Sequence, residues 1–306
     1  MLAVVILTKN SERTISSTLS SLVESSCIPK EVVIVDGGSK DNTLEIVKKF
    51  CDKLNVKIVY DEGRGLGYAR DIGWRVTSKN IKYVAMVDSD VAVDKTFFED
   101  ALQILEKDKN LGALGAKLKP ECNEKGILAK FQTKNLSIHL HWKEAPYPRE
   151  VIATHTACTI FRKSALEEIG GFDQYFRLAK EDSDIGFRLR KAGYRLSYVE
   201  HYVRHLETGK RFWSVNFRYG RSYVHISRKH PIEGKLWTKR NIIFTFSLIL
   251  FPSELLVWLY YFLRYVQLED VTFSEAFVLS FVETIRQIVR TAGMLYELLF
   301  HGTKKT

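Results

Sequence analysis

The first 120 residues alternate short runs of β-branched residues with segments of helical pattern. Five runs are typical of strands, at residues 2–8, 31–36, 57–60, 83–88 and 112–118. Between them, apolar residues recur at helical spacing at residues 12–25, 42–51, 66–77 and 95–106. Because consecutive parallel strands need crossover connections, usually helices, this order predicts an α/β fold: a mostly parallel, Rossmann-like central sheet with helices on both faces.

Polar side chains stand where four of the predicted strands end. Thr8-Lys9-Asn10 closes the first strand, residues 36–39 the second, Asp61-Glu62 the third and Asp88-Ser89-Asp90 the fourth. One carboxylate at a strand end is commonly a helix cap. Several at one edge indicate a binding site, because ligands of such sheets bind beyond the carboxyl ends of the strands.

Asp88 and Asp90 follow an apolar run, residues 84–87, that is typical of a buried strand. Two carboxylates at the turn after a strand can converge on one hard cation, with substrate phosphates completing its coordination. Mg²⁺ and Mn²⁺ both fit this arrangement. A turn with two solvated acids is the alternative, and Asp-x-Asp alone does not decide between them.

The loop after the third strand is rich in glycine and arginine, with Arg64 inside it and Arg70 in the following helix. Loop glycines let the backbone approach a ligand, and guanidinium groups suit phosphate. A dinucleotide-binding fingerprint is excluded, because Gly63, Gly65 and Gly67 have the wrong spacing and follow the third strand instead of the first.

Seven short motifs, in this order, resemble those of family 2 inverting glycosyltransferases, which have the GT-A fold. They are Thr8-Lys9-Asn10, Val35-Asp36-Gly37-Gly38-Ser39, Ala69-Arg70-Asp71-Ile72-Gly73, Asp88-Ser89-Asp90, Phe161-Arg162-Lys163-Ser164-Ala165-Leu166, Gly170-Gly171-Phe172-Asp173 and Glu181-Asp182-Ser183-Asp184-Ile185-Gly186-Phe187-Arg188-Leu189. The resemblance covers about residues 1–230. One departure is Asp71, where the family more often has Asn.

The resemblance implies a nucleotide-sugar donor, a UDP- or GDP-sugar, bound at the ends of the first strands. The donor-binding residues would be Thr8, Asn10 and Asp36 at the nucleoside, Arg70 near the diphosphate and Asp88 near the ribose, and we add Arg64 from the glycine loop.

The resemblance also implies the metal site and the base. Asp90 would coordinate Mg²⁺ or Mn²⁺ between the two phosphates, and His205 resembles a late histidine that also reaches the metal in some members. Asp182 would take the proton from the attacking acceptor hydroxyl, and in-line displacement would invert the anomeric configuration.

The presence of a base indicates the kind of acceptor. A sugar hydroxyl needs a proton removed, whereas a lipid phosphate is already ionised and would be repelled by a carboxylate. We therefore expect a hydroxyl acceptor, such as a lipid-linked glycan, with Glu181, Arg218 and Arg221 on the acceptor side. A polyprenyl-phosphate acceptor and a non-catalytic, membrane-tethered nucleotide-sugar-binding protein stay open as alternatives. Processive relatives carry Gln-x-x-Arg-Trp, which Lys210-Arg211-Phe212-Trp213 does not match, so we expect transfer of a single sugar.

The net charge of +10 is concentrated late in the chain, since residues 201–240 hold ten Lys and Arg against two Glu. Such a block suggests nucleic acid, anionic lipid or a phosphorylated ligand. The 22 largely apolar residues 242–263 follow it directly, which favours membrane lipids over nucleic acid. Because Pro252 and Glu254 interrupt them, residues 242–263 could span the bilayer, re-enter it, or pack against protein.

Residues 271–300 are also apolar, but five charged residues recur on one helical face. An interfacial helix, a partner for the preceding segment, and a helix packed on its own domain all fit this pattern. We expect a catalytic domain at residues 1–230, followed at residues 231–306 by membrane-associated helices. Four well-separated cysteines read as reduced thiols, and because the sequence runs straight into an apolar strand pattern we expect no signal peptide. We therefore expect a membrane-associated protein whose catalytic domain lies on the cytoplasmic side.

Overall fold

The computed structural model describes residues 1–121, 126–139, 147, 149–206, 212–234, 253–268 and 270–301. The chain divides into two compact units. Unit 1 comprises residues 1–121, 140–177 and 181–206, and unit 2 comprises residues 122–139, 178–180 and 207–306.

Unit 1 is built on one eight-stranded sheet with the order β3-β2-β1-β4-β7-β6-β8-β5. The strands are β1 (Leu2–Thr8), β2 (Glu31–Asp36), β3 (Val56–Tyr60), β4 (Tyr83–Asp88), β5 (Val91–Ala92), β6 (Leu111–Glu121), β7 (Cys158–Arg162) and β8 (Arg195–Leu206). β1 to β4 are parallel, as are β6 and β8, but β7 runs antiparallel to β4 and β6, and β5 antiparallel to β8. The sheet is therefore mixed, and the expectation of a mostly parallel sheet holds only for its first four strands.

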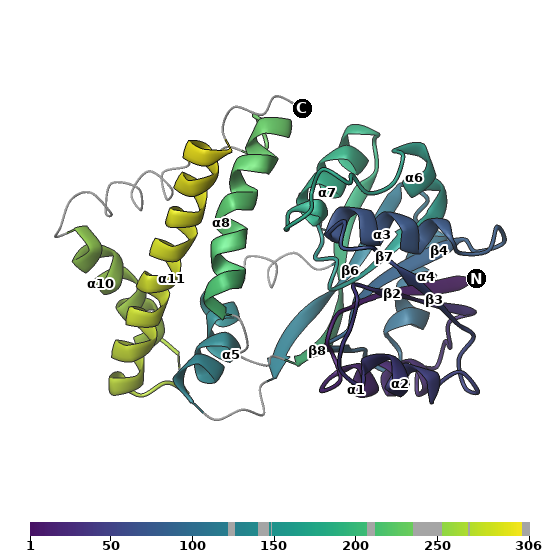
Figure 1. Ribbon diagram of the computed structural model, residues 1–306, viewed down its shortest axis with the longest axis horizontal. Coiled ribbons are helices and arrows are strands. Elements are labelled where there is room, and N and C mark those ends of the chain that lie inside the picture. Colours follow the sequence, from purple (N-terminus) through teal and green to yellow (C-terminus); the bar gives the residue numbers. More distant parts are fainter. Residues whose placement is uncertain are drawn as a thin grey trace. The chain divides into compact units, whose positions relative to one another are not determined.

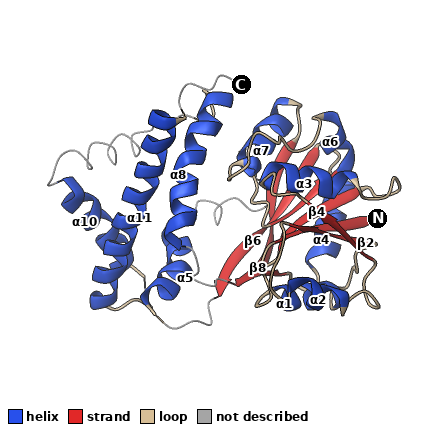
Figure 2. Cartoon of the chain, in the orientation of Figure 1, coloured by secondary structure: helices blue, strands red, loops and turns tan. Residues whose placement is uncertain are grey.

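Helices cover both faces of this sheet, as expected (Figure 2). The helices of unit 1 are α1 (Ile15–Val23), α2 (Thr43–Lys48), α3 (Leu66–Arg75), α4 (Phe97–Lys107), α6 (Lys163–Glu168) and α7 (Glu181–Lys191). Alternate strand residues such as Ala3 and Val5 pack with apolar residues of α3, α6 and α7 in one buried cluster. Val4 and Ile6, which lie between them in β1, are also fully buried, so the central strands are apolar on both faces, as a covered sheet requires.

Unit 2 is helical in its described part. It contains α5 (Ile127–His139), α8 (Phe212–Lys229), α10 (Ser253–Val266) and α11 (Phe273–Phe300). Its core includes Phe131 of α5, Phe212 of α8, Tyr265 of α10 and Leu279 of α11. The sequence pattern did not predict α5, which falls in a stretch of irregular pattern.

α8 and α11 approach each other through their backbones and lie side by side (Figure 1). A Cβ atom added to Gly220 would lie 1.9 Å from the carbonyl oxygen of Arg290, and one added to Gly293 would lie 2.2 Å from that of Phe217. Only glycine fits at either crossing point. The catalytic-domain boundary expected at residue 230 remains a prediction, although α8, which precedes it, packs within unit 2.

The expectation of a membrane-spanning helix is not supported. Much of residues 242–263 lies outside the described part, and the remainder belongs to α10, which is 14 residues long. Among the helices described, none combines the length and the apolar character needed to cross a bilayer. α11 has the length to cross a bilayer, but its recurring charged residues make it too polar to do so.

Candidate active site

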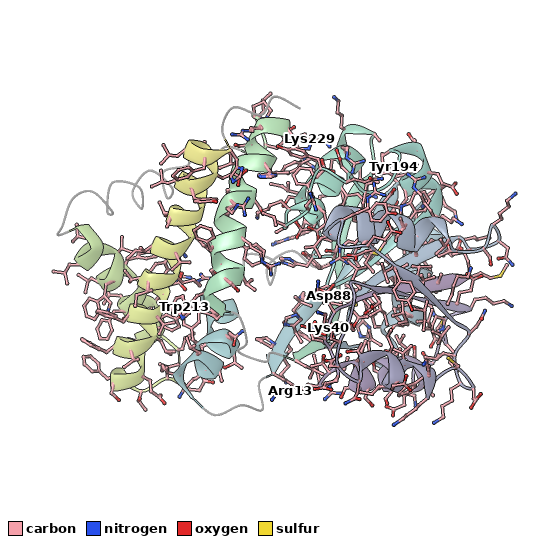
Figure 3. All side chains as sticks on the ribbon, viewed as in Figure 1. Arg13, Lys40, Asp88, Tyr194, Trp213 and Lys229 are labelled. Carbon is pink, nitrogen blue, oxygen red and sulfur yellow. The ribbon has the colours of Figure 1, made fainter. Side chains whose placement is uncertain are left out.

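The parallel strands bring the predicted donor residues to one edge of the sheet. In the strand register Thr8 pairs with Asp36, Leu7 with Asp88, and Asp36 with Tyr60. The carboxyl ends of β1, β2, β3 and β4 are therefore neighbours. Figure 3 labels Asp88 at the end of β4 and Lys40 in the loop after β2, both at this edge.

The loops that follow β1 and β2 are joined to each other by hydrogen bonds. The backbone N–H of Asn10 donates to the Ser39 hydroxyl at 2.9 Å, and the Asn10 side-chain oxygen accepts from the backbone N–H of Lys40 at 2.8 Å. Asn10 has a positive φ of 54°, which asparagine tolerates better than most residues. The two loops thus form a single surface at the end of the sheet.

Asp36 holds the second loop in shape. Its carboxylate accepts the backbone N–H groups of Gly38 and Ser39, both at 3.0 Å, and the Ser39 hydroxyl at 2.5 Å. The side chain is buried and its oxygens serve its own loop. Thr8, beside it, has a buried hydroxyl with no hydrogen-bond partner among the described residues.

Gly65, which caps α3, and Gly67, in the first turn of α3, serve packing. A Cβ atom on Gly65 would lie 2.6 Å from the Arg177 carbonyl oxygen, and one on Gly67 would lie 2.1 Å from that of Asp173. The sequence suggested that these glycines let the backbone approach a ligand. Instead, they let it approach another backbone segment of unit 1. Arg64 stacks over Tyr68 at 3.6 Å and remains at the surface.

Arg70 links two carboxylates that belong to two other sequence motifs. Its Nη2 lies 3.0 Å from Oδ1 of Asp88, and its Nε lies 3.1 Å from Oε1 of Glu181. Burial alone would lower the pKa of Arg70, yet the two carboxylates raise it. Its remaining nitrogen, Nη1, is buried without a hydrogen-bond partner among the described residues. The sequence did not predict this bridge.

Glu181 and Asp182 open α7 in contrasting environments. Glu181 is buried, and burial raises its pKa against the opposing effect of Arg70, while the neighbouring Asp182 charge raises it further. Asp182 is only partly buried, and its Oδ1 accepts from the Ser183 backbone N–H at 2.6 Å. The acid that remains accessible is therefore the one predicted to be the base.

Two residues near Asp182 were not predicted from the sequence. Thr156 lies with its hydroxyl 3.4 Å from Glu181, and Tyr198 accepts a hydrogen bond from the His155 backbone N–H at 3.2 Å. Burial, and to a smaller extent the Asp182 charge, raises the pKa of Tyr198. Thr156 lies just before β7 and Tyr198 lies within β8. Nothing in the sequence around either residue indicated a binding or catalytic role.

Asp90 and His205 are brought together by the last strand of the sheet. β5 pairs antiparallel with β8, so that Val91 lies opposite His205, and the His205 Nε2 lies 3.6 Å from Oδ1 of Asp90. Within the described residues no group of three or more His, Cys, Asp and Glu gathers as a cation site. A carboxylate and an imidazole at this distance fit a divalent ion whose remaining ligands are substrate oxygens and water.

Asp71, the departure from the family pattern, has a structural role. Its carboxylate accepts from the Trp74 indole N–H at 2.9 Å, the Phe172 backbone N–H at 3.1 Å and the Arg75 guanidinium at 2.8 Å. It thereby fixes α3 against the Gly170-Gly171 turn. No contact with the donor residues is involved.

Arg218 and Arg221 belong to unit 2, whereas the other predicted site residues belong to unit 1. Arg218 is exposed on α8, and Nε of Arg221 pairs with Glu297 of α11 at 2.7 Å. Their expected acceptor-side role remains a prediction.

Residues 3–170, more than half of the chain, match glycosyl transferase family 2. The chain belongs to this family. Membership confirms the resemblance seen in the motifs, and with it the expected enzyme class. Among curated members, the poly-β-1,6-N-acetyl-D-glucosamine synthase of Staphylococcus aureus (strain COL) is 28% identical over 191 residues, and that of Staphylococcus epidermidis is 29% identical over 192. Each match covers 62% of this chain but only 45% of the synthase, so the chain spans about half the length of these relatives.

Solved structures of glycosyltransferases share the fold of this family member. S. aureus TarS 1–349 in complex with UDP-GlcNAc has a TM-score of 0.54 at 20% identity, covering 100% of this chain and 93% of that one. The mannosyltransferase PcManGT from Pyrobaculum calidifontis, in complex with GDP-Man and Mn²⁺, has a TM-score of 0.55 at 16% identity, covering 100% and 76%. At such identities the likeness establishes the GT-A fold alone.

Proposed function

We propose that this family member transfers a single sugar from a nucleotide-diphosphate sugar to an acceptor hydroxyl, with inversion at the anomeric carbon and Asp182 as the base. One observation carries the proposal. Through Arg70, the Asp88 carboxylate at the donor edge is tied to Glu181, the residue next to Asp182. A predicted donor-binding residue, Asp88, and the neighbour of the predicted base, Glu181, are thus connected through one arginine.

The base needs to be accessible to the acceptor, and of the two neighbouring acids only Asp182 keeps solvent access. Glu181 is buried against Arg70, which fits a positioning role for that acid. Asp182 keeps solvent access and lies at the first turn of α7, where the helix dipole favours its negative charge. These environments favour Asp182 as the group that meets an acceptor hydroxyl.

In the proposed reaction Asp182 takes the acceptor proton as the acceptor oxygen bonds to the anomeric carbon. The bond between that carbon and the diphosphate oxygen breaks, and its electron pair leaves with the nucleotide diphosphate. Mg²⁺ or Mn²⁺ held by Asp90 and His205 would offset the charge that develops on the diphosphate. The loops joined through Asn10 and Ser39 supply a preformed surface for the nucleoside.

Two solved structures of the same fold indicate which donors to test. TarS binds UDP-GlcNAc and PcManGT binds GDP-Man and Mn²⁺, so UDP- and GDP-sugars are the donors to test. We keep a hydroxyl acceptor, such as a lipid-linked glycan, as the expected acceptor. The absence of a Gln-x-x-Arg-Trp motif supports addition of one sugar, although the curated relatives are named as polymer synthases.

The test is nucleotide diphosphate release from a panel of UDP- and GDP-sugars, with Mn²⁺ or EDTA, in the presence of a lipid extract. Metal-dependent release from one donor, stimulated by the extract, supports the proposal. Mass spectrometry of the product then separates one added sugar from a polymer, and a hydroxyl acceptor from a lipid phosphate. Donor binding without release would favour a non-catalytic nucleotide-sugar-binding protein instead.

A further inference from the structure

The helices α10 and α11 of unit 2 expose an unusual share of the large apolar side chains. Fourteen of the 24 exposed large apolar side chains among the described residues lie on these two helices. On α10 they are Leu255, Leu256, Leu259, Tyr260, Leu263 and Val266. On α11 they are Phe273, Phe277, Val278, Phe281, Ile285, Tyr296, Leu299 and Phe300.

The exposed residues of α11 share one face along its whole length. At about 100° per residue, the spacing from Phe273 through Phe277, Phe281 and Ile285 to Tyr296 and Leu299 keeps them within one half of the helix. A helix of 28 residues is about 42 Å long, which exceeds the roughly 30 Å hydrocarbon core of a bilayer. A continuous face of this length suits a helix that lies along a surface.

The opposite face of α11 carries its charged residues, and it is turned inward. Glu283, Arg286 and Glu297 are buried, and Glu275 and Arg290 are partly buried, so none of the five charged residues of α11 is exposed. A helix on a water-facing surface shows the reverse arrangement, with its charges outside. α11 is therefore inverted relative to the helices of a protein surrounded by water.

The inward charges are paired with each other and with α8. Nη2 of Arg286 lies 2.6 Å from Oε1 of Glu283, Nε of Arg290 donates to Asn216 at 2.8 Å, and Glu297 accepts from Arg221 at 2.7 Å. Buried charges are tolerated only with such partners. The inward orientation of these charges is thus held by ion pairs and hydrogen bonds within unit 2, and the apolar face of α11 points outward.

The charge of unit 2 identifies the kind of surface that this face would meet. Unit 2 holds 18 Lys and Arg against nine Asp and Glu, a formal charge of +9, whereas unit 1 holds 28 against 27. Nearly all of the net charge of +10 therefore accompanies the apolar face. A negatively charged lipid surface combines the two features that match it, an apolar interior and anionic head groups.

We propose that the apolar face of α10 and α11 inserts into one leaflet of an anionic bilayer, with α11 lying along the membrane plane. The exposed phenylalanine and leucine side chains enter the boundary between head groups and acyl chains. The buried ion pairs remain on the protein side, and basic residues of unit 2 attract the anionic head groups. This attachment requires no helix that spans the bilayer, and it does not depend on the proposed catalytic activity.

The experiment is flotation of the full chain with vesicles of phosphatidylcholine alone and of phosphatidylcholine mixed with phosphatidylglycerol. We expect binding to the mixed vesicles that weakens at ~1 M salt, where the screening length falls to about 3 Å. A Phe277→Gln/Phe281→Gln variant should bind the mixed vesicles at least about tenfold more weakly, because two apolar side chains no longer enter the lipid.

The matched control is Ile28→Gln in unit 1, since Ile28 and Phe281 are each 56% exposed. This control should bind as the unchanged chain does, and the circular dichroism of both variants should match that of the unchanged chain. The Phe277/Phe281 variant should melt somewhat lower, because the Phe277 ring packs against Trp258 at 5.0 Å, so binding is compared at a temperature at which both variants are folded. Three results would overturn the proposal. They are no vesicle binding by the full chain, equal binding by the Phe277/Phe281 variant, and a dimer in light scattering that this variant dissociates, which would assign the face to a second copy.

Discussion

Arg70 holds Asp88 through an ion pair of 3.0 Å while its other edge pairs with Glu181. The end of β4 and the start of α7 are thereby fixed to each other by one buried side chain. A guanidinium suits this position because its planar fork can serve two carboxylates at once, which an ammonium group on a flexible stem does less well.

Replacing Arg70 by Gln should lower the free energy of unfolding by about 3–5 kcal/mol, because it leaves the buried Glu181 carboxylate without its partner. Arg70→Lys should be intermediate in stability and should lose transfer activity, since it cannot hold both carboxylates in the same geometry. Urea unfolding and nucleotide release measure the two effects. Wild-type stability in Arg70→Gln would show that the bridge does not form.

Asp182→Asn should reduce kcat by two or more orders of magnitude while donor binding is retained, because the amide keeps the shape of the carboxylate but cannot accept the proton. Calorimetric titration with the donor and Mn²⁺ measures binding, and nucleotide release measures kcat. Asp52→Asn, at an exposed turn of unit 1, is the matched control and should leave both unchanged. Normal transfer by Asp182→Asn would assign the base elsewhere.

Asp90→Ala and His205→Ala should each weaken Mn²⁺ binding in the presence of a nucleotide diphosphate, because either substitution removes one side of the pair that lies 3.6 Å apart. Mn²⁺ electron paramagnetic resonance measures this directly, without turnover. Asp90→Ala should also lower transfer. His201→Ala is a useful comparison, because His201 belongs to the same strand but pairs with Asp100, and it should bind Mn²⁺ normally.

Glu275 should stabilise unit 2 in a pH-dependent manner. Its side-chain hydrogen bond with Lys130, together with hydrogen bonds at the capping box with Thr272, lowers its pKa from 4.5 to about 2. A lowered acid pKa contributes stability that is present above 4.5 and is lost as the pH falls towards 2. The melting temperature of Glu275→Gln should therefore lie below wild type at pH 7 and converge with it near pH 2. A constant difference across this range would contradict the assignment.

Gly293→Ala should destabilise the pairing of α8 with α11 by roughly 1–3 kcal/mol, since its Cβ would meet the Phe217 carbonyl oxygen at 2.2 Å. Ala292→Val adds volume one residue away on the exposed side of the same helix, and should change stability by no more than about 0.5 kcal/mol. Thermal unfolding compares the two. Equal effects would mean that the backbones do not approach as closely as described.

The regular strands and the polar strand ends were predictable because they depend on local pattern. The bounds of β1, β2 and β4 agree with the prediction, since each is a clear apolar run with a polar or turn residue at its end. The antiparallel direction of β7 was not predictable, because an apolar run carries no mark of strand direction. The two-residue strand β5 is too short to produce a pattern.

The connections within the site were not predictable, because they join residues far apart in sequence. Arg70 and Glu181 are separated by 111 positions, and nothing around Arg70 in the sequence indicates its partners. In unit 2 the charged face of α11 was recognised, but its direction was not. Periodicity shows that a helix has two unlike faces, and only packing decides which one is buried.

Because β5 pairs with β8, the candidate cation site can form only after the last strand of the sheet has been synthesised. Asp90 is synthesised early, but its neighbour His205 arrives only with the final strand of the sheet. A nascent chain can complete the four parallel strands and the joined loops at their ends long before the candidate cation site has its second side chain. Affinity for metal would therefore report that the last strand has paired, and a full chain with His205→Ala should retain the nucleoside surface yet lose much of that affinity.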